Sequence, residues 1–166
     1  MKGTLRFLQL LSIVVWVGGI IFFAFVLAPV SFQTLPSVHL AGAVVGAALR
    51  VLDRIGLTCG IIFLFATALF AFKSRIRPRR NSQLELLFAA AMMLATAYLH
   101  WSILPTMERD RAPTGGDIAA VAPENPARVA FDRLHQRSEH TEEFVLLAGL
   151  GVVFLLSRDE AWAGRN

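Results

Sequence analysis

Long apolar stretches without a charged side chain limit what this chain can fold into. The first runs from residue 7 to residue 30 and contains no Asp, Glu, Lys or Arg. A helix of this length can cross the roughly 30 Å hydrocarbon core of a bilayer. Lys2 and Arg6 precede it as in a secretory signal, but the run exceeds the roughly 7 to 15 residues of a signal core. We therefore expect a retained membrane anchor.

Three further segments have a similar character. We expect membrane spans at about 7–30, 51–72, 84–104 and 137–157. The last has a clean apolar run only over residues 144–156, so a short interfacial or re-entrant helix is the alternative. Gly149 and Gly151 in that run are typical of packed membrane helices and favour the full span. The prediction is an all-α protein, an integral membrane four-helix bundle that forms one domain over residues 1–166.

The composition agrees with a lipid environment. Hydrophobic residues make up 55% of the chain and charged residues only 17%, whereas an average soluble domain has about 25% charged residues. Such a composition excludes disorder for most of the chain. The lone Cys59 excludes an intrachain disulfide and a zinc site built on paired cysteines.

Basic residues determine the expected orientation. The link between the second and third spans is basic, with Lys73, Arg75, Arg77, Arg79 and Arg80. By the positive-inside rule this link is cytoplasmic. Four spans then make both the N-terminus and the C-terminus cytoplasmic, and the loop 105–130 faces outward. We expect a multi-pass protein of the cell inner (plasma) membrane, in contact with the lipid bilayer and without a nucleic-acid partner. No internal repeat is evident, so the sequence gives no case for an inverted-repeat transporter core.

All four histidines fall on the predicted outer side. On a helical wheel His135, Glu139 and Glu142 share the face of the last helix that points into the bundle. Ionisable groups near hydrocarbon are costly and tend to pair, to face a cavity or to mark a functional path. Imidazole and carboxylate together suit transition metals such as zinc or copper. The predicted metal ligands are His100, His135, Glu139, His140 and Glu142.

Other interpretations of these residues are open at this stage. His100 and His135 lie on different helices and could ligate haem iron in a membrane redox protein. The same groups could form a proton path, or only a hydrated helix entrance with salt bridges to nearby arginines. The glycine spacings 42/46 and 56/60 could dock another membrane protein or a second copy of the chain, as in a structural or assembly subunit. An enzyme has the least support, because no short catalytic motif is present.

Three stretches resemble a known family. They are WVGGIIFFAFVLAPVSF at residues 16–32, ILPTMERDR at residues 103–111 and FDRLHQRSEHTE at residues 131–142. They are similar to motifs of the small membrane proteins related to transmembrane protein 205, which carry a domain of unknown function. The resemblance covers nearly the whole chain and implies a four-helix membrane bundle. The motif residues with an expected structural role are Trp16, Gly18, Gly19, Pro29, Pro105, Arg111 and Ser138.

The same family is distantly similar to copper-resistance D-type membrane proteins and to haem-binding relatives with intramembrane histidines. This kinship implies copper, another transition metal or haem b as candidate cofactors. His135 and Ser138 are the residues that carry over, and Glu142 stands where the family often has Asn. The leading interpretation is a protein that binds, or helps to move, a metal ion or small solute at an outer-facing His/Glu pocket.

Overall fold

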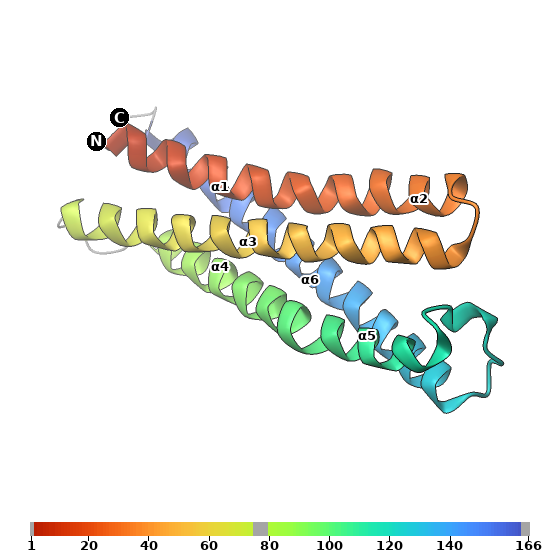
Figure 1. Ribbon diagram of the computed structural model, residues 1–166. Helices are drawn as coiled ribbons and strands as arrows, with labels where there is room; N and C mark the ends of the chain where they lie inside the picture. The colour runs from red at the N-terminus through yellow and green to blue at the C-terminus, as the bar shows by residue number, and fades with distance from the viewer. Residues whose placement is uncertain (1, 75–79, 164–166) are drawn as a thin grey trace.

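The described part of the chain is helical and contains no strand. The computed structural model describes residues 2–74 and 80–163. Its α-helices are α1 (Lys2–Phe22), α2 (Ala28–Thr34), α3 (Val38–Ser74), α4 (Arg80–Tyr98), α5 (Leu104–Arg111) and α6 (Pro126–Ala163). Two π turns, η1 (Phe23–Leu27) and η2 (Leu99–Ile103), and two 3-10 turns, η3 (Ala112–Thr114) and η4 (Ile118–Ala120), complete the order (Figure 1). Most of the basic link on which the predicted orientation rests lies outside the described residues.

Four helical segments have the length and composition needed to cross a membrane. They are Gly3–Thr34, Val38–Phe70, Ser82–Thr114 and Pro126–Arg158. The all-α, four-helix membrane prediction is thereby confirmed, and the fourth segment is a long helix rather than a short interfacial one. Large apolar side chains on the outside of the bundle, such as Phe25, Leu94 and Leu147, are 68–73% exposed. In a membrane these side chains contact lipid.

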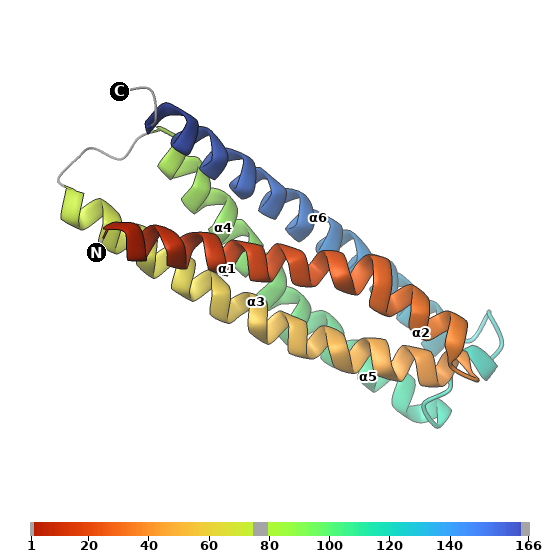
Figure 2. The same cartoon turned by 90° about the horizontal axis from the view of Figure 1, so that it is seen from above.

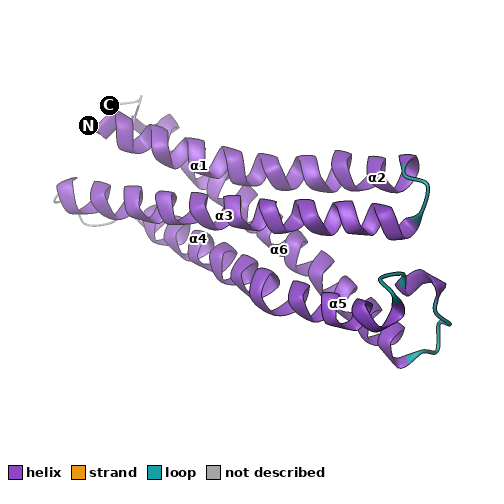
Figure 3. Ribbon diagram, viewed as in Figure 1, coloured by secondary structure: helices purple, strands orange, loops and turns teal. Residues whose placement is uncertain are grey.

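The bundle consists of two helical hairpins. The first hairpin is α1, η1 and α2 packed on α3, and the second is α4, η2 and α5 packed on α6. α1 begins and α6 ends at the same end of the bundle (Figures 1 and 2). The opposite end, called the loop end below, carries residues 35–37 and 112–125. Among the described residues, the non-helical connections gather there (Figure 3). Figure 1 shows the two hairpins diverging toward this loop end.

The end near the termini is closely packed. Trp16 is 3% exposed, and a side chain added at Gly56 or Gly60 would collide with its indole ring. The small residues of α3 therefore make room for Trp16, as expected for helices in close approach. A Cβ added at Gly19 would lie only 2.7 Å from Leu52 Cδ1, so Gly19 is also closely packed. A Cβ added at Gly18 would meet no atom within 4 Å. Only one of these two adjacent glycines is a packing residue.

In each hairpin, the first spanning segment contains a π turn followed by a proline. η1 begins at Phe23 and Pro29 follows it, and η2 begins at Leu99 and Pro105 follows it. Proline has no N–H to donate and its ring crowds the preceding turn of an α-helix. A π turn widens the helix at that point. Both helices therefore continue past their prolines instead of ending there.

The loop between α5 and α6 is shorter than the loop expected from the sequence. The expected loop covered residues 105–130, but α5 extends to Arg111 and α6 begins at Pro126. Proline is favoured in the first turn of a helix, where its missing N–H would have no partner, which explains the early start of α6. α3 and α6 have 37 and 38 residues. At 1.5 Å per residue each is about 55 Å long, more than a roughly 30 Å hydrocarbon core requires. Each of the two helices is therefore long enough to extend beyond the core.

Candidate functional site

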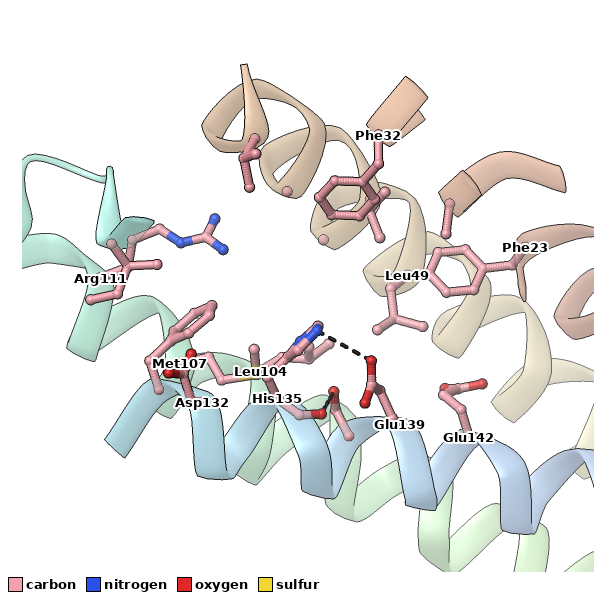
Figure 4. A pocket seen from close by; sticks show the side chains of 18 of the residues that line it. Phe23, Phe32, Leu49, Leu104, Met107, Arg111, Asp132, His135, Glu139 and Glu142 are labelled. Atoms are coloured by element: carbon pink, nitrogen blue, oxygen red, sulfur yellow. Dashed lines mark hydrogen bonds and ion pairs between the residues drawn. The ribbon is translucent and has the colours of Figure 1, made fainter. Parts of the chain in front are cut away.

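A cavity lies between the two hairpins at the loop end. Its volume is about 720 Å³, within the roughly 300–1,000 Å³ of small-molecule sites. All four spanning segments contribute to its wall, and residues 116–119 of the loop between α5 and α6 also line it. Since the hairpins are closely packed at the other end, the cavity follows from their divergence (Figures 1 and 4).

The wall of the cavity is mainly apolar. Large side chains from both hairpins line it, among them Phe23, Phe32, Leu49, Leu104 and Met107 (Figure 4). The predicted glycine face of α3 at residues 42 and 46 also lines it. No atom lies within 4 Å of a Cβ added at residue 46, whereas a Cβ added at Gly42 would lie 3.5 Å from the Arg111 guanidinium of α5. The pair at residues 56 and 60 is packed much more closely, because a Cβ at either position would collide with Trp16.

Charged side chains lie along the cavity in a row. Figure 4 shows Arg111 at one end, Glu142 at the other, and His135 and Glu139 between them. His135 Nε2 lies 3.3 Å from Glu139 Oε1, one helical turn away, and both side chains are more than half exposed. Such an exposed pair adds at most about 1 kcal/mol to stability. The His135–Glu139 pair therefore lines the cavity but contributes little to the stability of the fold.

Three buried polar atoms on this wall have no hydrogen-bond partner. They are Nδ1 of His39, Nε of Arg111 and Oε2 of Glu142. A buried polar group without a partner costs about 1–3 kcal/mol. Such groups are therefore rare in native structures, and a cluster of them in one cavity points to a bound molecule or ordered water that satisfies them.

The motif at residues 131–142 positions the middle of the row. The Arg111 guanidinium lies 5.1 Å from the centre of the Phe131 ring. The rings of Phe131 and His135 are nearly parallel, with centroids 6.1 Å apart. The buried Ser138 hydroxyl donates a hydrogen bond of 2.7 Å to the His135 carbonyl oxygen. One face of α6 thus holds His135 toward the cavity, in agreement with the bundle-facing stripe expected from the sequence.

A second polar pair is buried deeper in the bundle. His100 Nδ1 in η2 lies 3.2 Å from Asp53 Oδ2 in α3, and the two side chains are 11% and 2% exposed. Neither residue lines the cavity. The sequence pattern did not single out Asp53, which stands between Arg50 and Arg54 near the start of the predicted second span. Its spacing to Gly56 and Gly60 would have placed it on the packing face of α3.

The five predicted metal ligands do not converge on one point. His100 pairs with Asp53 and His135 with Glu139, whereas His140 lies 3.3 Å from Glu143 with both side chains about 70% exposed. In the part of the chain that the structure describes, no group of three or more His, Cys, Asp and Glu could hold a metal ion. Of the two predicted haem ligands, only His135 lines the cavity. The arrangement offers single polar groups around an apolar space.

The loop between α5 and α6 contacts the cavity residue His39 through a glycine. Gly116 has a φ of 88°, which L-residues rarely adopt, and an added Cβ would lie 2.9 Å from His39 Cε1. Gly115 also has a positive φ but has no neighbour within 4 Å.

We expect Gly115→Ala to lower the free energy of unfolding by about 1 kcal/mol and Gly116→Ala by about 2 kcal/mol. Denaturation of both variants in detergent measures this difference. Equal losses would show that the His39 contact contributes nothing.

The chain was compared with known proteins. The sequence model of the DUF4149 family, described as a domain of unknown function, matches residues 11–112. The matched region includes nearly all of the first hairpin as well as α4 and α5, and it ends before α6. No curated protein and no solved structure matches the chain. The finer resemblance to transmembrane protein 205 and copper-resistance D-type proteins stays an expectation.

Proposed function

This chain belongs to the DUF4149 family, whose model matches more than half of it, and we propose that it binds a small organic solute in the cavity at the loop end. The observation that carries the proposal is the combination of an apolar cavity of about 720 Å³ with three buried polar atoms that lack partners. Ligand sites in proteins combine an apolar wall with a few converging polar groups. A solute with an apolar body and polar ends fits this wall.

The geometry favours an organic solute over the other predicted ligands. A transition metal in a protein needs several His, Cys or carboxylate ligands around one point, and the described residues supply such groups only in pairs. Haem iron with two axial histidines needs both on one cavity, whereas His100 is engaged with Asp53 outside it. Elemental analysis and an absorption spectrum of the purified protein test both alternatives.

The location of the cavity indicates from where a solute enters. It lies at the loop end, where α3 and α6 are longer than the hydrocarbon core requires. The proposal includes the orientation expected from the basic link, with both termini cytoplasmic in the inner membrane, so that the cavity faces outward. A solute would then come from the outer side without crossing lipid.

A glycine substitution fills the cavity without disturbing the bundle. Gly46 lines the cavity, and a Cβ at this position meets no atom within 4 Å. Leucine also has a higher helix propensity than glycine. We expect the wild-type protein to retain a small molecule in native mass spectrometry after extraction from its membrane, and Gly46→Leu to lose at least about nine-tenths of it, a change of about tenfold in occupancy.

A second glycine of the same kind gives the control. Gly18 also has no neighbour within 4 Å, but it lies on the exposed surface of α1 away from the cavity. Gly18→Leu should keep the bound molecule at the wild-type level. A wild-type protein with no bound organic molecule, or equal retention in Gly46→Leu and Gly18→Leu, would contradict the proposed function.

A further inference from the structure

The two hairpins repeat the same construction in the same direction. Phe23 and Leu99 begin the two π turns, and the prolines at residues 29 and 105 follow them at the same distance. In the alignment that places Phe23 on Leu99, buried positions of α1 and α2 fall on buried positions of α4 and α5. The buried pairs are Gln9 with Glu85, Ile13 with Ala89, Trp16 with Met92, Ile20 with Thr96 and Ser31 with Met107.

The second helices of the hairpins also correspond. In the register that places Gly60 on Gly149, buried positions of α3 fall on buried positions of α6. The pairs are Leu49 with Ser138, Gly56 with Val145, Cys59 with Ala148, Phe63 with Val152 and Thr67 with Leu156. The residue types differ, which is why no repeat is evident in the sequence although burial recurs at equivalent positions.

Contacts across the bundle confirm that the two registers belong to one approximate two-fold axis. A Cβ added at Gly60 would meet Trp16 of its own hairpin and Met93 of the other hairpin. A Cβ added at Gly149 would meet Met92 of its own hairpin and Val17 of the other. Met92 and Met93 are the counterparts of Trp16 and Val17, so the two glycines make reciprocal contacts.

The axis relates the buried Asp53 of α3 to the partly buried Glu142 of α6. Asp53 and Glu142 are separated by the same sequence distance as Gly60 and Gly149. His100, the second residue of η2, pairs with Asp53 of the opposite hairpin. The counterpart of His100 is Ala24, the second residue of η1. Asp53 therefore has the His100 imidazole as its partner, whereas the equivalent position opposite Glu142 is occupied by Ala24.

Both members of this incomplete pair line the cavity. Ala24 and Glu142 are part of its wall, and Glu142 Oε2 has no partner. The space that an imidazole would occupy in the repeat belongs to the cavity. We propose, building on the proposed function, that the end of the cavity between Ala24 and Glu142 binds a cationic nitrogen of the solute, such as a protonated amine. The solute supplies the partner that the second hairpin obtains from its own histidine. Charge-assisted hydrogen bonds of this kind are about twice as strong as neutral ones.

Two probes of the same shape test the charge requirement. 2-Phenylethylamine and 2-phenylethanol differ in the terminal group, and their binding to the full chain in lipid nanodiscs is measured by calorimetry against empty nanodiscs. We expect the wild-type protein to bind the amine about tenfold more tightly than the alcohol. Glu142→Gln keeps the shape of the side chain and should abolish this preference. Ala24→His should abolish it as well, because its imidazole occupies the space beside Glu142.

A matched substitution outside the cavity gives the control. Glu108 does not line the cavity and forms an exposed pair with Arg50, so Glu108→Gln should keep the preference for the amine. Equal binding of both probes by the wild-type protein would overturn this inference and leave the proposed function standing. A preference that survives Glu142→Gln would overturn it too. Failure of both probes to bind, together with a wild-type protein that retains no solute, would contradict both proposals.

Discussion

Replacing His100 with alanine should be among the most destabilising single changes in this bundle. The substitution leaves the Asp53 carboxylate, which is 2% exposed, without the imidazole at 3.2 Å. Arg50 offers no replacement, because it already binds Glu108 at 2.7 Å. Leaving a buried polar group without its hydrogen-bond partner typically costs about 1–3 kcal/mol, and more where the group is charged. We expect His100→Ala to lower the free energy of unfolding by that amount in denaturation with sodium dodecyl sulfate, followed by circular dichroism.

Two further variants show that the loss comes from the unpaired carboxylate. His140 forms an exposed pair with Glu143 at a similar distance of 3.3 Å, so His140→Ala should cost less than about 1 kcal/mol. Adding Asp53→Leu to His100→Ala removes the buried acid that has lost its partner, and the double variant should recover part of the stability. A double variant less stable than His100→Ala would show that Asp53 does not depend on His100.

The helix count could be predicted because it depends on local properties of the chain. Apolar runs of sufficient length identify membrane helices wherever they occur, and four such helices are present. The position of His135 toward the bundle followed from helical periodicity in the same way. The ends of the helices were predicted less well, since Pro29 and Pro105 break an ordinary α-helix but are accommodated after a π turn.

The site could be predicted only in part. The sequence placed His135, Glu139 and Glu142 on one face of a helix, and all three line the cavity. It also grouped His100 with them, because topology alone puts the residues on the same side of the membrane. Whether His100 meets Glu142 or Asp53 depends on how the hairpins cross, and spacing within one helix carries no information about that. The repeat was hidden for a related reason, because burial recurs at equivalent positions while residue types do not.

The packing of Trp16 gives the second large expected effect. This side chain is 3% exposed and fills the space that Gly56 and Gly60 leave on α3. Trp16→Ala opens a cavity between two helices that cannot approach further without moving the other hairpin. Truncation of a buried tryptophan to alanine costs about 3–5 kcal/mol, and we expect a loss of this size in the same denaturation measurement.

Trp101 provides a control of the same residue type. It is 68% exposed on the outside of the bundle, where its ring contacts lipid head groups or chains rather than another helix. Trp101→Ala should therefore change the free energy of unfolding by less than about 1 kcal/mol. If Trp16→Ala and Trp101→Ala lose the same stability, the indole of Trp16 is not held between the helices.

The reciprocal glycine contacts predict a similar effect in the second hairpin. Met92 occupies the equivalent place against Gly149, so Met92→Ala should cost about 2–5 kcal/mol and resemble Trp16→Ala more than Trp101→Ala.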